Sequence, residues 1–249
     1  MGDRPLWIRS GMKQNKINIL STRLLDDEFT GELEGEDILV DSLPFIKTEP
    51  VSTTELRKKI QEALAKTTTV VFTSANAVEP VASEKESQQL IQKIFCIGHS
   101  TKRSVVKYFG ERSIAGVADN AKELATAILD ANVSELIFFC GDQRRDELPA
   151  LLKKHKVNVK EITVYSTIAI PEKIEKKYEA ILFFSPSAVK SFFEYNLPGD
   201  QTVLFAIGNT TAEEIKNYSK NKIVVSDVPD ANTLLQTAVT FFKNNPIHH

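Results

Sequence analysis

The sequence lacks any long hydrophobic run. No apolar stretch approaches the roughly 18–20 residues that a membrane-spanning helix needs, and no hydrophobic signal-peptide core is visible near the start. We therefore expect a soluble, cytoplasmic protein without a membrane partner. Residues 248–249 resemble the stub of a purification tag, and we interpret residues 1–11 as vector-derived too, with Met12 as the native start.

Residues with an obvious catalytic or metal-binding pattern are scarce. The chain has two cysteines and four histidines, and none has a metal-ligand spacing. Cys96 and Cys140 lie inside apolar runs, which is typical of buried, reduced strand residues. The motifs G-x-G-x-x-G, G-x-x-x-x-G-K-[ST] and G-x-S-x-G do not occur. The sequence therefore has neither a glycine-rich phosphate cradle nor the nucleophile elbow of a hydrolase.

Neither sign of charge is in clear excess. The 31 basic and 33 acidic side chains give a net charge of −2. Nucleic-acid-binding proteins more often have a basic excess on one face, so we expect no nucleic-acid partner. An anionic ligand would have to be held by local groups, because the whole chain does not attract it.

The composition is that of a globular α/β protein. The 249 residues, 42% of them hydrophobic and 26% charged, correspond to about 1.7 domains of average size. Short apolar runs alternate with amphipathic segments, which predicts parallel sheets flanked by helices on both faces. The expected strands are residues 17–22, 69–74, 94–98, 113–117, 136–140, 160–165, 180–185, 204–208 and 223–226.

Three helices have recognisable signals. Ser52 and Glu55 form a capping-box pattern and predict a helix start. A second helix is expected from about Thr210, again with a carboxylate, that of Glu213, three residues later in the sequence. A third is expected to follow Asn232, with Leu235, Val239 and Phe242 on one face.

The sequence contains an internal repeat. Three segments recur in order, at offsets of 110 or 111 residues: 70–78 as 181–189, 95–101 as 205–211, and 120–124 as 230–234. We infer two homologous α/β units. The proline-containing segment 37–51 and the segment between Tyr165 and Pro171 are expected to be extended and to cross between them. This predicts a discontinuous lobe of residues 12–38 plus 170–246, and an inserted lobe of residues 40–166.

Candidate ligand-binding residues lie where the strands end. In doubly wound sheets, ligands bind outside the carboxyl ends of the strands. Here these ends carry small or hydroxylated residues at the start of a helix, where backbone N–H groups can bind an anion. Such residues also serve as ordinary helix N-caps, and both interpretations stay open. The turns are residues 22–23, 74–76, 98–101, 141–144, 185–187 and 208–211.

Tyr165 stands out among the remaining polar residues. It ends a strand where the chain begins to cross between lobes, so its phenol could donate a proton to a leaving group. The alternative is a buried hinge aromatic whose hydroxyl is satisfied by the backbone. His99 and Arg144 are interpreted as turn and first-turn residues, with ligand contact as the alternative, and His155 as a solvated helix end.

Taken in order, eight motifs resemble the uroporphyrinogen-III synthase family of tetrapyrrole biosynthesis. They are residues 22–23, 72–78, 98–101, 141–148, 164–167, 184–189, 206–212 and 229–234, and the match extends from about residue 17 to 242. The resemblance implies two α/β lobes joined by a two-stranded extended connector. It also implies an enzyme that closes linear hydroxymethylbilane, which bears eight carboxylates, with loss of water and inversion of ring D. It implies no cofactor and no metal.

The resemblance further implies roles for individual residues. Tyr165 would be catalytic and assist departure of the hydroxyl. We expect a monomer that binds this small-molecule substrate through Arg23, Ser74, Ala75, Asn76, Gly98, Thr101, Gly141, Ser185, Pro186, Ser187, Gly208, Thr210 and Thr211. The alternatives are a non-catalytic bilobal module that binds a polyanion and, less compatible with the short turns, a sugar-phosphate or nucleotide-sugar transferase.

Overall fold

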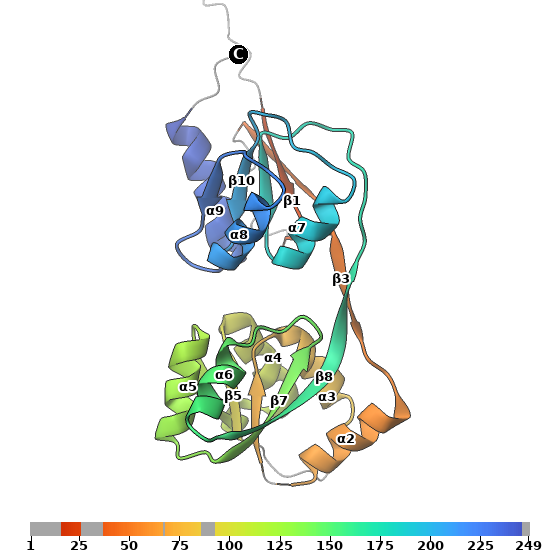
Figure 1. Cartoon of the computed structure of the whole chain (residues 1–249), viewed down its shortest axis with the longest axis vertical. Helices are drawn as coiled ribbons and strands as arrows, with labels where there is room; N and C mark the ends of the chain where they lie inside the picture. Colours follow the sequence, from red (N-terminus) through yellow and green to blue (C-terminus); the bar gives the residue numbers. More distant parts are fainter. Residues whose placement is uncertain (1–15, 26–36, 67, 86–92, 246–249) are drawn as a thin grey trace, which may run out of the picture. The chain divides into compact units, whose positions relative to one another are not determined.

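The chain divides into two compact units. The computed structural model describes residues 16–25, 37–66, 68–85 and 93–245 (Figure 1), so the ends interpreted as vector-derived lie outside the described residues. Unit 1 comprises Met1–Lys47 and Ala169–His249, and unit 2 comprises Thr48–Ile168. None of the helices in the described part of the chain has both the length and the hydrophobicity to cross a membrane.

Unit 1 is a parallel sheet with helices on both faces. Its strands are β1 (Ile17–Ser21), β2 (Ile38–Ser42), β9 (Ala180–Phe183), β10 (Val203–Ala206) and β11 (Ile223–Val225), and its helices are α7 (Pro186–Phe193), α8 (Asn209–Lys216) and α9 (Ala231–Asn244). The strand order is β11-β10-β9-β1-β2, and every pair is parallel. Successive strand residues point to opposite faces. Leu182 accordingly packs with α9, whereas Phe183 packs with α7 and α8.

Unit 2 has the same construction with a further strand at one edge. Its strands are β3 (Ile46–Pro50), β4 (Thr69–Phe72), β5 (Lys93–Ile97), β6 (Ile114–Ala118), β7 (Glu135–Gly141) and β8 (Asn158–Ala169), in the order β3-β8-β7-β4-β5-β6. The pairs among β4 to β8 are parallel. Hydrogen bonds from Ile170 N to Phe45 O (3.0 Å) and from Val51 N to Val164 O (3.0 Å) place β3 antiparallel to β8.

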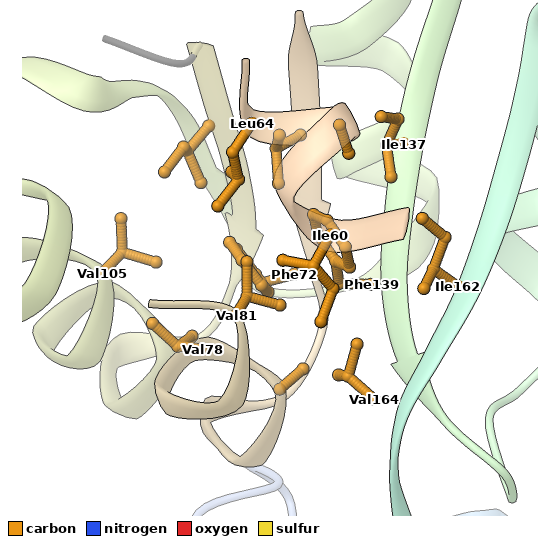
Figure 2. Packing of buried hydrophobic residues seen from close by; sticks show 14 of the residues in the cluster. Ile60, Leu64, Phe72, Val78, Val81, Val105, Ile137, Phe139, Ile162 and Val164 are labelled. Atoms are coloured by element: carbon orange, nitrogen blue, oxygen red, sulfur yellow. The ribbon is translucent and has the colours of Figure 1, made fainter. Parts of the chain in front are cut away.

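Helices cover both faces of the unit 2 sheet. They are α2 (Thr54–Leu64), α3 (Val78–Ala82), α4 (His99–Phe109), α5 (Ala121–Asp130) and α6 (Glu147–Lys154). On one face α2, α3 and α4 pack over Phe72 and Phe139, whose rings stack at 5.7 Å (Figure 2). On the other face α5 and α6 pack over Phe95 and Phe138. Most of the strand residues are hydrophobic because both faces of the sheet are buried.

The structure confirms all nine expected strands and corrects several boundaries. Strands β2 and β3 form within the segment 37–51, which was expected only to be extended. Because β2 pairs with β1, residues 40–47 group with unit 1 and not with the inserted unit. Helix α2 is capped by Thr53, whose side chain accepts a hydrogen bond from Leu56 N at 3.1 Å; the expected cap, Ser52, precedes it. Helix α8 begins at Asn209, with Gly208 as its N-cap.

The sequence repeat corresponds to a repeat of structure. Residues 70–78 and 181–189 each contain a strand, a serine-capped turn and the start of a helix. The order β6-β5-β4-β7-β8 of unit 2 matches β11-β10-β9-β1-β2 of unit 1. In unit 1, however, the counterparts of β7 and β8 come first in the chain. The two units therefore share one topology with circularly permuted chain order.

Candidate functional site

Tyr165 lies within β8, which continues to Ala169, and not at the end of a strand as expected; an irregularity in β8 positions its side chain. Cys140 pairs with Thr163, but the next residue, Gly141, pairs with Tyr165, so Val164 is skipped and the strand bulges. Such a bulge changes the direction of the side chain that follows it. The ring of Tyr165 lies directly against Gly141, where an added Cβ would overlap the ring and come within 2.8 Å of the hydroxyl oxygen.

The phenol of Tyr165 lies in an environment that keeps it protonated. Burial raises its pKa above the ordinary value of 10.0, whereas a hydrogen bond with Ser74 acts in the opposite direction. The Ser74 hydroxyl also accepts a hydrogen bond from Asn76 N at 3.3 Å. The structure thus brings together Tyr165, Gly141 and the turn 74–76. Here a neutral phenol can donate a proton.

A pocket of ≈ 730 Å³ opens beside this cluster in unit 2. Ala75, Asn76 and Tyr165 line it, together with residues of α3 and α4. Two of the latter, Arg103 and Lys107, were missed by sequence reasoning. Their spacing of four residues on the helix after the Gly98 turn is the signal that could have identified them.

The turn after β7 is held by its own contacts. Asp142 N donates to Tyr165 O at 3.1 Å, and Asp142 Oδ1 accepts from Thr167 N at 2.9 Å. Arg144 forms ion pairs with Asp146 and Glu161, and the hydrogen bond to Asp146 raises the pKa of its guanidinium. Arg144 therefore has structural contacts, but it lies in the loop before α6 and not in the expected first turn, because this helix begins at Glu147 with Asp146 as its N-cap.

The two glycine turns differ from the serine turns in how their helices begin. Gly98 caps α4 and Gly208 caps α8, and in neither helix does a side chain of the cap accept a first-turn N–H. Gly98 has a φ of 81°, which is readily adopted only by glycine. Open N–H groups at a helix start can bind an anion.

The threonines that follow these glycines point away from solvent. Thr101 is 2% exposed and Thr211 is 0% exposed. The Thr211 hydroxyl is buried and has no hydrogen-bond partner among the described residues. Thr210, in contrast, is exposed in the first turn of α8. The exposed side chains of this turn are therefore Asn209 and Thr210, and Thr211 N already donates to Gly208 O at 3.1 Å.

Unit 1 has a second group of the expected residues, at the ends of the neighbouring strands β1 and β9. The exposed guanidinium of Arg23 lies over the Phe184 ring, 5.3 Å from its centroid. Ser185 accepts a hydrogen bond from Ala188 N at 3.1 Å, and its hydroxyl lies 3.2 Å from that of Ser187. Pro186 is the first residue of α7. The strand order reverses between β1 and β9, which is where doubly wound sheets bind ligands.

The cysteines behave as expected from the apolar runs around them. Cys96 and Cys140 are free and buried, and burial raises the pKa of both thiols. Within the residues that the structure describes, no group of three or more His, Cys, Asp or Glu side chains could hold a metal ion.

Comparison with known proteins identifies the family. Residues 27–236 match the family model described as uroporphyrinogen-III synthase HemD. A curated uroporphyrinogen-III synthase from Saccharomyces cerevisiae is 25% identical over 202 residues, which are 67% of this chain and 73% of the yeast protein.

Solved structures show the same fold. Uroporphyrinogen-III synthetase from Helicobacter pylori 26695 has a TM-score of 0.64 at 15% identity, covering 90% of this chain and 99% of its own. A mutant uroporphyrinogen III synthase from the extremely thermophilic bacterium Thermus thermophilus has a TM-score of 0.61 at 14% identity, covering 92% and 100%. The fold thus agrees with a family match that spans most of the sequence. The chain belongs to the uroporphyrinogen-III synthase family.

Proposed function

We propose that this enzyme of tetrapyrrole biosynthesis converts linear hydroxymethylbilane into uroporphyrinogen III. The family match supports this activity, and it does not favour the alternative of a non-catalytic polyanion-binding module. The observation that carries the site is the placement of Tyr165, whose neutral phenol lines a pocket beside the turn 74–76.

In the proposed reaction, Tyr165 donates its proton to the substrate hydroxyl, which leaves as water. The resulting azafulvene is attacked by the terminal pyrrole, and the spiro intermediate rearranges so that ring D is inverted when the macrocycle closes. A flexible tetrapyrrole must be held in the spiro-forming conformation, so positioning supplies a large part of the rate.

The eight substrate carboxylates need many separate contacts. We assign them to N–H groups at the starts of α4 and α8, which follow Gly98 and Gly208, to the turns 74–76 and 185–187, and to Arg23. Local contacts are required because the net charge of −2 does not attract an anion. We further propose that the protein is a cytoplasmic monomer. Its balanced charge supports the proposal that it acts without nucleic acid.

The reaction can be tested by generating hydroxymethylbilane in situ, adding the protein and identifying the isomer of the cyclised product. We expect isomer III. Isomer I alone, which forms spontaneously, would refute the proposal.

The role of Tyr165 can be tested with Tyr165→Phe. We expect kcat to fall about 10- to 100-fold and the isomer to remain III, because the proton donor is lost but substrate positioning survives. Tyr195→Phe is the matched control, since Tyr195 is 58% exposed and lies in unit 1. An unchanged kcat in Tyr165→Phe would remove Tyr165 from the mechanism.

A further inference from the structure

The pocket of unit 2 has two basic side chains on one wall. Arg103 and Lys107 are four residues apart on α4, so they lie on the same face of the helix, and both line the pocket. Asn76 and Tyr165 contribute other parts of the lining. The volume of ≈ 730 Å³ falls within the range of about 300–1,000 Å³ that is typical of small-molecule sites.

Both basic groups are available to a ligand. Within the described parts of the chain, neither side chain forms an ion pair or a hydrogen bond with another residue. The Lys107 ammonium lies over the Tyr108 ring, 4.7 Å from its centroid, which still leaves its N–H donors open. By comparison, Arg57 and Arg144 of the same unit are paired with glutamates.

The pocket lining is positive overall. The acidic and basic side chains in the lining are Arg103, Lys107 and Glu79. Two cations against one carboxylate favour an anionic ligand, and arginine is well suited to carboxylate because its planar fork can donate two parallel hydrogen bonds.

We infer that Arg103 and Lys107 bind the acetate and propionate carboxylates of one pyrrole unit of the substrate in the pocket bordered by Tyr165. This inference rests on the proposed function and adds the side chains that hold this part of the substrate. The carboxylate of Glu79 lines the same pocket and repels the substrate carboxylates. Removing the charge of Arg103 or Lys107 should therefore weaken substrate binding, and removing the charge of Glu79 should strengthen it.

The test is steady-state kinetics with hydroxymethylbilane on three variants. We expect Arg103→Gln and Lys107→Gln each to raise KM about 3- to 10-fold, while kcat changes less than about twofold, because ground-state and transition-state binding are lost equally. Glu79→Gln should lower KM. Such opposite shifts would not follow from a general loss of structure.

Controls separate charge at the pocket from charge elsewhere. Arg112→Gln and Lys122→Gln remove the same charges from unit 2 outside the pocket lining, and their KM should equal that of the wild type. Arg103→Lys should recover part of the lost affinity. In anaerobic calorimetric titration with uroporphyrinogen III, the affinities of the wild type and the variants should follow the same order as their KM values. Inorganic phosphate, tested as a competing small anion, should bind far more weakly than uroporphyrinogen III.

The outcomes distinguish this inference from the proposed function. If both variants keep the wild-type KM and product affinity while isomer III is formed, the inference is wrong and the enzyme assignment stands. If the wild-type protein forms only isomer I, the proposed function itself fails, and the inference fails with it.

Discussion

Gly141 is the residue whose meaning changes most when the fold is known. It is a proposed substrate-binding residue at a strand end, but its missing side chain also makes room for the Tyr165 ring. The requirement is spatial, because Gly141 does not have a positive φ. The groups that a Cβ would meet are at the far end of the tyrosine, which can move. Gly141 thus also determines where the ring of Tyr165, the proposed proton donor, lies.

We predict that Gly141→Ala displaces the Tyr165 ring and lowers kcat about 10- to 100-fold, since small misplacements of a catalytic group have effects of this size. The melting temperature should change little, because the ring can shift without disturbing the backbone. In a Tyr165→Phe background, Gly141→Ala should cause little further loss of kcat. A wild-type kcat in Gly141→Ala would show that the ring position does not matter.

The amino-acid sequence predicted only part of the candidate site. Sequence reasoning selected Tyr165, Ser74 and Asn76, and the structure brings these together. It could not show that Thr211 is buried whereas Thr210 is exposed, because both follow the same glycine. It also missed Arg103, since membership of a pocket depends on packing between α3 and α4, which are distant from β8 in sequence.

At the scale of elements, the turns after the strands are of two kinds. Ser74, Ser185, Asn120 and Asp230 each accept a hydrogen bond from a first-turn N–H, as ordinary N-caps do. Gly98 and Gly208 provide no such acceptor. Capping is thus observed at the serine, asparagine and aspartate turns, and it does not prevent the remaining N–H groups of the turns 74–76 and 185–187 from binding the anion proposed above. The repeat preserves both kinds at matching positions.

Buried strands were predictable because their hydrophobic runs are continuous, but two of the four edge strands, β2 and β3, were not predicted as strands. Strand β3 contains Lys47, Thr48 and Glu49, which are exposed, and ends at Pro50, so no apolar run marks it. Its pairing depends on β8, more than 100 residues later. Helix boundaries shifted where two candidate caps are adjacent: Thr53, not Ser52, is placed to accept from Leu56 N.

The C-terminal helix offers a clean test of the capping interpretation. Asp230 Oδ1 accepts hydrogen bonds from Asn232 N (2.9 Å) and Thr233 N (3.1 Å) at the start of α9. We predict that Asp230→Ala lowers the free energy of unfolding of unit 1 by about 1 kcal/mol, because a cap is lost from a helix whose apolar face is buried. Chemical unfolding followed by circular dichroism measures this.

Asp227→Ala is the matched control for the cap. Asp227 is exposed, carries the same charge three residues earlier and caps no helix. Its loss should leave the unfolding midpoint unchanged. Equal destabilisation by both substitutions would mean that charge, and not the cap, stabilises this end of α9.

At the scale of the whole molecule, each unit has its own hydrophobic core. The clusters around Phe205 and Phe183 consist of unit 1 residues, and those around Phe72 and Phe95 consist of unit 2 residues. The shared strand order explains why the repeat was visible in the sequence. In the permuted order, β1 and β2 of unit 1 correspond to β7 and β8 of unit 2.

Separate cores predict that the units fold independently. We expect residues 48–168, expressed alone, to give a cooperative thermal transition and an α/β circular dichroism spectrum, because a continuous segment of this size contains a complete doubly wound sheet. Residues 48–130 are the control. They lack β7 and β8, which follow β4 in the order of the sheet, and should remain unfolded.

Unit 1 can be tested by excising residues 48–168. The two strands that would be rejoined are already adjacent, since Ile170 N donates to Phe45 O at 3.0 Å. Lys47→Asn together with one inserted Gly before Ala169 should therefore close the chain with a two-residue Asn-Gly turn between Ile46 and Ala169, which lie opposite each other in this register. We expect this variant to fold with a stable five-stranded sheet, observed as a cooperative unfolding transition. A non-cooperative transition would mean that unit 1 depends on unit 2, contrary to the separation of their cores.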